Sequence, residues 1–77
     1  MDWRLAETRL HQAVEISRRQ AARMFELRAA ISLACIWAER GDRRRAYQLL
    51  APVYGWFTEG FNTADLKDGK ALLDALA

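Results

Sequence analysis

The chain has 77 residues, 52% of them hydrophobic, and a net charge of +2, which is typical of a single globular domain. One cysteine, Cys35, excludes an intramolecular disulfide, and one histidine, His11, without a cysteine cluster argues against a structural metal site. A chain of this length buries only about 60% of the surface that its unfolded form exposes. Its stability must therefore come from tight helix packing or from association with other protein.

Nothing in the sequence resembles a secretion signal or a membrane span. Asp2, Arg4 and Glu7 interrupt the first residues, where a signal peptide needs an apolar run. The apolar stretch 29–38 is about half of the roughly 20 residues that cross a membrane. We therefore expect no membrane association, and a cytoplasmic location, which is the default for a chain without a cysteine pair.

Charge is unevenly distributed along the chain. Residues 1–50 contain ten arginines and six acidic residues, a net charge of +4, whereas residues 51–77 contain two lysines and four acidic residues, a net charge of −2. Arginine is well suited to carboxylates, phosphates and protein interfaces. The basic part of the chain is therefore a candidate for binding an acidic partner.

The composition between the few turn signals favours helices. Alanine, leucine, arginine, glutamate and glutamine are strong helix formers, and no segment alternates with the period of a strand. We therefore predict an all-α fold of about four helices, over residues 3–19, 21–40, 42–58 and 64–76.

The first predicted helix, 3–19, is amphipathic. Its apolar stripe contains Ala6, Leu10 and Ala13 and continues through either Ile16 or Ser17. This spacing predicts one face packed against a neighbouring helix.

The second predicted helix, 21–40, is apolar on nearly all sides, so we expect a central helix that is buried by several neighbours. Cys35 lies within it, which predicts a buried, inert thiol. Gly41 follows the helix and predicts a C-cap.

The third predicted helix, 42–58, has Asp42 as its N-cap. Pro52 lies inside it and removes one backbone hydrogen bond, which predicts a kink or a short break near 48–52.

The fourth predicted helix, 64–76, is capped by Asn62 or Thr63 and is expected to cover the third helix. Gly69 in its middle costs about 1 kcal/mol relative to alanine. It either permits a close contact with another helix or has no structural purpose.

Residues at fixed offsets predict that helices 21–40 and 42–58 form an antiparallel pair. Ala34 and Ala46 are small enough for the two backbones to approach, and Trp37 fills the groove beside them. The pattern resembles the tetratricopeptide repeat, which has Leu-Gly/Ala, an aromatic residue, Gly-Asp and Ala at these relative positions. The matching residues are Leu33-Ala34, Trp37, Gly41-Asp42, Ala46 and Leu50.

The sequence also contains an internal echo, in which one spacing recurs forty positions later. The two sets are Ala6, Leu10 and Ala13, and Ala46, Leu50 and Val53. The first helix therefore resembles the second helix of a preceding repeat. This divides the single domain, 1–77, into a half repeat over 1–20, a full repeat over 21–58 and a capping helix over 62–77.

A closer resemblance covers most of residues 6–76. The chain is similar to the C-terminal segment of bacterial multidomain proteins that join a class III adenylate/guanylate cyclase domain, or a DNA-binding regulator domain, to a predicted ATPase module and a tetratricopeptide-like array. The similar segments are ELRAA at 26–30, SLA at 32–34, LAPVYGWFTEGF at 50–61, TADLK at 63–67 and ALL at 71–73. The resemblance implies a terminal, capping piece of a helical array. No cyclase or ATPase motif is present in the sequence, so no catalytic role carries over.

Aromatic residues are the first candidates for contacts with a partner. Trp56 and Phe61 either anchor a partner, as aromatic residues often do, or pack the joint between the third and fourth helices. Trp3 is either an interface residue or packs on the second helix.

Arginine residues are the second group of candidates. Arg43, Arg44 and Arg45 either contact an acidic or phosphate-bearing partner or form a solvated first turn of the third helix.

Taken together, these features predict a non-enzymatic scaffold module that binds protein, through self-association or a different protein. A small nucleic-acid-binding helical domain is the alternative, although the net charge of +2 and the lack of a recognition-helix motif make it weaker. No cofactor, metal ion or small-molecule substrate is expected.

Overall fold

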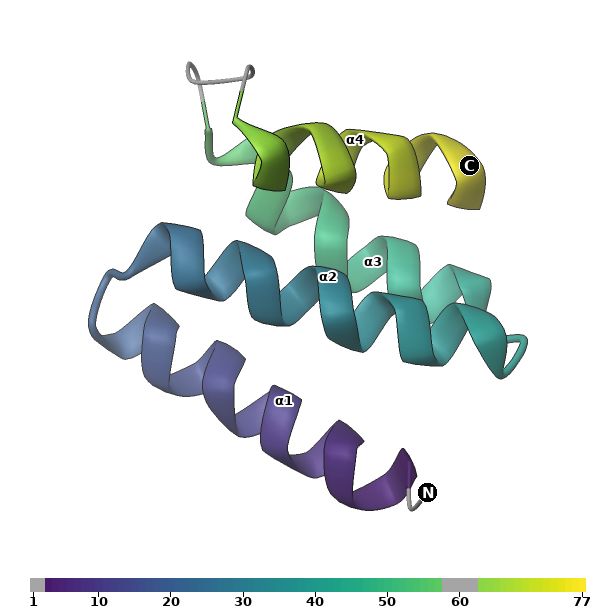
Figure 1. Cartoon of the computed structure of the whole chain (residues 1–77), viewed down its shortest axis with the longest axis horizontal. Coiled ribbons are helices and arrows are strands. Elements are labelled where there is room, and N and C mark those ends of the chain that lie inside the picture. Colours follow the sequence, from purple (N-terminus) through teal and green to yellow (C-terminus); the bar gives the residue numbers. More distant parts are fainter. Residues whose placement is uncertain (1–2, 58–62) are drawn as a thin grey trace.

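The structure is a computed structural model that describes residues 3–57 and 63–77, and this part of the chain is helical throughout apart from its turns. Figure 1 shows its four helices, and no strand occurs in these two ranges. The all-α prediction is confirmed. The helices are α1 (Trp3–Arg19), α2 (Arg23–Glu39), α3 (Arg43–Gly55) and α4 (Ala64–Leu76).

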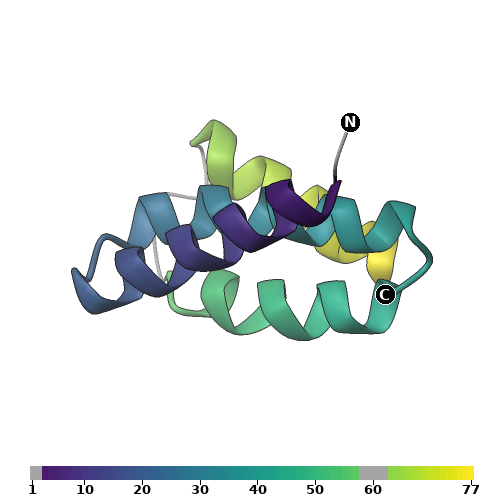
Figure 2. The same ribbon diagram turned by 90° about the horizontal axis from the view of Figure 1, so that it is seen from below.

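Helix α2 is the centre of the molecule. It packs against α1, α3 and α4, whereas the backbone of α1 packs only against α2 within the described ranges and reaches α3 through the Glu7–Arg45 ion pair. Successive helices run in opposite directions in Figure 1, and Figure 2 shows α3 on one side of the layer that α1 and α2 form. The predicted central helix is therefore confirmed, because a helix that is apolar on most sides needs several neighbours to cover it.

The same left-handed cap connects α1 to α2 and α2 to α3. The turning residues have positive φ, 55° at Ala21 and 89° at Gly41, so the predicted glycine C-cap is confirmed. The two caps lie twenty positions apart, and the helices that end at them, α1 and α2, have 17 residues each, whereas α3 has 13. In each cap a backbone N–H donates to a carbonyl of the last helical turn at 2.8 Å, from Ala22 to Ser17 and from Asp42 to Trp37.

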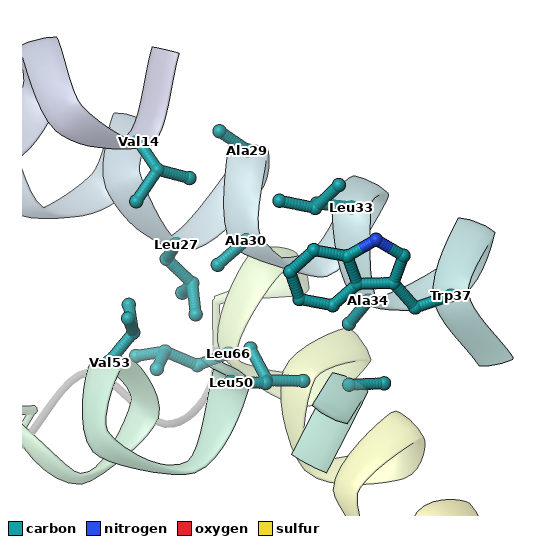
Figure 3. Close-up of a cluster of buried hydrophobic side chains, with 11 residues drawn as sticks. Val14, Leu27, Ala29, Ala30, Leu33, Ala34, Trp37, Leu50, Val53 and Leu66 are labelled. Carbon is teal, nitrogen blue, oxygen red and sulfur yellow. The ribbon is translucent and has the colours of Figure 1, made fainter. Parts of the chain in front are cut away.

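The core lies between α2 and its neighbours. Ala34 and Ala46 are fully buried and Trp37 is only 3% exposed, so the predicted contact between α2 and α3 is confirmed. Small side chains at a crossing allow two helix backbones to approach closely. Figure 3 shows the surrounding side chains, which are Val14, Leu27, Ala29, Ala30, Leu33, Leu50, Val53 and Leu66.

Helix α1 packs with Ser17 inward, while Ile16 is exposed, and this decides between the two alternatives for its stripe.

The prediction that Cys35 is buried is wrong, because the side chain is exposed on α2. Three helices cover three sides of α2, and Cys35 lies on the fourth side. Arg28, Ser32 and Glu39 are exposed on the same side at helical spacing, and these polar residues were the sequence signal for it.

Helix α3 begins as predicted, because an Asp42 side-chain oxygen accepts a hydrogen bond from the Arg45 backbone N–H at 3.3 Å. The helix continues through Pro52 to Gly55, so no break occurs at the proline. It ends before the predicted boundary at residue 58, which lies outside the described ranges. The exposed Pro52 ring faces away from the core.

Helix α4 covers α2 and α3 and approaches them closely at Gly69, which is buried. A Cβ atom there would lie 3.4 Å from Tyr54 Cδ2 and 3.6 Å from the Cδ1 atoms of Ile31 and Leu27. Gly69 therefore lies at a close helix contact. Thr63 is the N-cap residue, although its side chain makes no capping hydrogen bond, and the alternative cap, Asn62, lies outside the described residues.

Candidate protein-binding surface

The Glu7 carboxylate organises one end of the molecule, where α1, α2 and α3 meet. The Trp37 indole Nε1 donates a hydrogen bond to Glu7 Oε1 at 2.8 Å. The guanidinium groups of Arg40 and Arg45 lie 3.8 and 3.9 Å from the same carboxylate. Arg45 also lies over the Trp37 ring, with its Cζ atom 4.0 Å from the centroid. This predicted partner residue is therefore held by its own chain.

Trp3 packs on the second helix and is also accessible at the surface, so it combines the two alternatives that the sequence left open. Its ring stacks under the Arg40 guanidinium, whose Cζ atom lies 3.3 Å from the ring centroid, so Trp3 packs on the end of α2. The side chain is also half-buried and lines a surface depression with Ala6, Ile36 and Glu39. Trp3 is therefore positioned at the surface and held by a cation–π contact.

The three consecutive arginines do not form a single basic patch. Arg43 donates a hydrogen bond to the Ala75 carbonyl and ties α3 to the end of α4. Arg45 points to Glu7, whereas Arg44 lines a different depression with Tyr47. Successive residues on a helix lie about 100° apart, so three neighbouring side chains are spread over most of its circumference.

Trp56 lies at the surface, with 54% of the residue exposed. Its ring meets Phe57 edge-on at a centroid distance of 5.3 Å, and the Arg23 guanidinium lies over it at 4.7 Å. Trp56 thus contacts its own chain while keeping an accessible face. Phe61, the other predicted aromatic anchor, lies outside the described residues.

A buried carboxylate near the corner between α1 and α2 was not predicted from the sequence. Glu26 is only 2% exposed, and its two oxygens meet Arg18 Nε at 3.1 Å and Arg23 Nη1 at 3.2 Å. A buried charge needs such partners because leaving water is costly. The sequence signal was an acidic residue among the apolar residues of the central helix. The Arg18–Glu26 pair fastens α1 to α2, and the two arginines occupy both oxygens of the Glu26 carboxylate.

An apolar groove runs along the seam between α1 and α2, on the side away from α3. Phe25 and Ile16 stand at its rim with 64% and 53% of each residue exposed. Small residues form much of its floor. The lining includes Leu10, Ala13, Ile16 and Ser17 of α1 and Phe25, Arg28, Ala29 and Ser32 of α2.

A separate depression at Trp3 lies farther along the same two helices. Ala6 lies one helical turn from Leu10 on α1, and Ile36 lies one turn from Ser32 on α2. We call the two depressions together the α1–α2 groove. Phe25 and Trp3 lie at its opposite ends.

The described ranges contain no cluster of side chains suited to a metal ion. These residues contain no group of three or more histidine, cysteine, aspartate or glutamate side chains that is able to hold a metal ion. His11 packs against the Trp37 ring at a centroid distance of 5.9 Å. Across the same part of the chain, the helices are too short or too polar to cross a membrane.

Cys35 is the one exposed thiol of the described chain. Partial desolvation by its neighbours raises the pKa of the Cys35 thiol, and the negative charge of Glu39 raises it further. The thiol is therefore protonated at neutral pH, which is the opposite of an activated nucleophile.

No protein-family model, curated protein or solved structure matches this chain. Function is therefore inferred from the geometry of the surface. Its main features are the α1–α2 groove, the two exposed side chains at the groove rim, and the cluster around Glu7 at one end.

Proposed function

We propose that this chain is a non-enzymatic helical module that binds protein. The observation that carries the proposal is the unequal covering of the outer helices. Within the described ranges the backbone of α1 packs against α2 alone, although Glu7 pairs with Arg45 of α3, and exposed Ile16 and Phe25 border the groove between α1 and α2. Apolar side chains grouped along a groove are typical of protein interaction sites.

The opposite side of the molecule supports the same proposal. The outward side of α4 carries charged residues, and its buried residues face α2 and α3. A polar outer face is what a terminal helix of a stacked array needs, whereas an apolar face calls for another layer. The exposed charged residues of α4 are Lys67, Asp68, Lys70 and Asp74.

The proposed architecture is a tetratricopeptide-like array in which α4 is the cap. The α2–α3 pair, with Ala34 and Ala46 buried at its contact, supports this proposal. The equal connections at Ala21 and Gly41 support it as well, because each of them reverses the direction of the chain between neighbouring helices. The resemblance to the C-terminal segment of bacterial cyclase and ATPase-type multidomain proteins implies the same terminal position in an array. We also propose a cytoplasmic location, which is the default for a chain without a cysteine pair.

Two measurements on the full chain test this function. Multi-angle light scattering over a range of concentrations reports self-association, and a mass that rises with concentration supports a homo-oligomer. Affinity purification from its own cells, followed by quantitative mass spectrometry, reports a different protein. A strictly monomeric chain that also retains no protein in stoichiometric amount would contradict the proposal.

Nucleic-acid binding is the second candidate, and the observation in its favour is the exposed Arg44. This candidate is weaker because Arg43 and Arg45 contact their own chain, at the Ala75 carbonyl and the Glu7 carboxylate. Electrostatic binding to phosphates falls steeply with salt. Retention of a labelled DNA or RNA oligonucleotide at low salt, lost at high salt, would support this candidate, and no retention at low salt would remove it.

A further inference from the structure

We infer that the α1–α2 groove is a homodimer interface, in which a second copy of this chain lies antiparallel on the first around a two-fold axis. This inference rests on the proposed protein-binding function and names its partner and its contacts. The exposed residues of both groove helices are placed symmetrically about one common level, and this symmetry is what a second copy requires.

Two contacts fix the register of α1 against α2. Near one end of the groove, the Trp37 indole donates a hydrogen bond to Glu7 at 2.8 Å. Near the other end, Arg18 pairs with Glu26 at 3.1 Å. On each helix these two contacts lie eleven residues apart, so the step between residues 10 and 11 lies level with the step between residues 33 and 34. We call this level the groove midpoint.

A two-fold axis at the groove midpoint, perpendicular to the helices, defines the dimer. It lays α1 of the second copy antiparallel on α1, and α2 antiparallel on α2. Helix α3 lies on the other side of the layer that α1 and α2 form, so it leaves this face open (Figure 2). Every contact across such an axis occurs twice. Each side chain on one side of the midpoint therefore needs a suitable neighbour at the same distance on the other side.

Apolar side chains meet this requirement. Leu5 and Ile16, 51% and 53% exposed, lie eleven positions apart on the same side of α1, and the groove midpoint lies halfway between them. Ile16 of each copy therefore faces Leu5 of the other. Phe25 and Trp3 lie at opposite ends of the groove, at nearly equal distances from its midpoint. Exposed Phe25 thus reaches the depression beside Trp3 of the second copy.

The exposed charges of α2 meet the requirement as well. Arg28 and Glu39 also lie eleven positions apart, with the groove midpoint halfway between them. Arg28 donates through Nε to Asp65 of its own chain, and 61% of its side chain remains exposed. In the antiparallel dimer, Glu39 of each copy lies beside this exposed guanidinium. Parallel stacking would instead place each of these charges beside its own copy, so charge selects the antiparallel arrangement.

The centre of the interface contains both favourable and unfavourable residues. Ala13, Ala29 and Ser32 line the groove and are small enough to let the helices of the two copies approach. Arg9 opposes this approach, because it is exposed within two positions of the midpoint and comes near Arg9 of the second copy. Its like-charge contact weakens the dimer and provides a test of the two-fold axis.

Sedimentation equilibrium of the full chain, from about 1 μM to about 500 μM, tests the inference. We expect a monomer–dimer equilibrium. Leu5→Glu and Ile16→Glu should each raise the dissociation constant about tenfold or more, because each substitution occurs twice in the interface. The matched control is Tyr47→Glu, which changes an exposed aromatic residue on α3 and should leave the constant unchanged. All three positions are exposed, so circular dichroism should show an unchanged fold.

Charge reversal tests the antiparallel arrangement. Arg28→Glu places carboxylates opposite each other, and Glu39→Arg places guanidinium groups opposite each other, so each variant should dimerise at least about tenfold more weakly. When the two variants are mixed, their heterodimer has opposite charges at both contacts. Native mass spectrometry of an equimolar mixture should therefore show the heterodimer above its statistical share.

Arg9→Gln tests the position of the axis. Removing the like-charge contact should strengthen the dimer by up to about fivefold, measured by the same sedimentation experiment. A dimer that is weakened by this substitution would place Arg9 away from the axis and contradict the inferred register.

Three results separate this inference from the broader function. A chain that stays monomeric up to about 500 μM overturns the homodimer, and the protein-binding function still stands if affinity purification retains a different protein. A dimer that is unaffected by Ile16→Glu shows that the copies meet on another face, which overturns the groove assignment alone. A mixture of the charge variants without excess heterodimer overturns the antiparallel arrangement.

Discussion

At the scale of single residues, the two helix connections offer a matched test of backbone strain. The same cap has alanine at one position, Ala21, and glycine at the other, Gly41, and both have positive φ. A left-handed conformation costs a residue with a Cβ atom about 1–2 kcal/mol. The left-handed geometry of the cap therefore favours glycine over alanine at both positions.

The first prediction is that Ala21→Gly raises the free energy of unfolding by about 1 kcal/mol and that Gly41→Ala lowers it by a similar amount. No side chain lies within 4 Å of a Cβ atom built on Gly41, so the effect is that of the backbone alone. Urea denaturation measures both changes. Shifts of the same sign for the two variants would contradict the strain argument.

The second prediction concerns Cys35. Because desolvation and Glu39 raise its pKa, less thiolate is present at any given pH than in an ordinary cysteine. We expect iodoacetamide to alkylate the folded chain more slowly at neutral pH than the denatured chain, despite the exposed position. The rate should increase as the pH rises toward the raised pKa. Glu39→Gln should lower the pKa and speed alkylation, and an unchanged rate in that variant would contradict the role of Glu39.

At the scale of the helices, close packing and buried charge decide how the elements are joined. Gly69 lets α4 approach α2 and α3 closely. The space beside its Cα atom is nevertheless large enough for a methyl group. A Cβ atom would make ordinary contacts at 3.4–3.6 Å. The contact thus tolerates one methyl group but no larger side chain.

The third prediction is that Gly69→Ala stabilises the chain by up to about 1 kcal/mol, because alanine is the better helix former. Gly69→Leu should destabilise it, since the added atoms would meet Tyr54 and Leu27. Thermal unfolding followed by circular dichroism measures both variants. A loss of stability in the alanine variant equal to that in the leucine variant would show that the contact accepts no added atom.

The fourth prediction concerns the joint between α1 and α2. Replacing both Arg18 and Arg23 by methionine leaves the buried Glu26 carboxylate without a partner, which should cost about 3 kcal/mol. Glu26→Gln removes the buried charge and leaves arginines that reach water, so it should cost less. Chemical denaturation of the two variants compares them. The reverse order would mean that Glu26 does not depend on these arginines.

At the scale of the whole molecule, the uneven covering of the helices predicts uneven stability. Helix α1 packs against one neighbour within the described chain, whereas α2 packs against three. Local opening is easiest where few buried apolar contacts resist it. The open side of the molecule is therefore also its least stable side.

The fifth prediction is that the backbone amides of α1 exchange with deuterium faster than those of α2 and α3. Native-state hydrogen exchange followed by mass spectrometry measures the order. Equal protection of α1 and α2 in the free chain would contradict this account.

Much of this architecture followed from local sequence patterns. The helix spacing predicted α1, α2 and α4 to within a few residues, and Asp42 and Gly41 predicted the cap and turn of one hairpin. Helix-forming residues and capping residues act within one or two turns, so a sequence read alone contains their effect. Ala34 and Ala46 likewise predicted the contact between α2 and α3.

The direction of side chains on the surface was decided by tertiary structure. Cys35 became exposed because three neighbours left one side of α2 open. The three arginines separated, because Arg43 bonds to Ala75, Arg45 pairs with Glu7 and Arg44 lines a different depression. The Glu26 clamp and the α1–α2 groove depend on how two helices meet, which local patterns do not contain. Sequence by itself determined which segments are helical and which faces are apolar. Only packing over long sequence separations decided which of those faces stay uncovered and available to a partner.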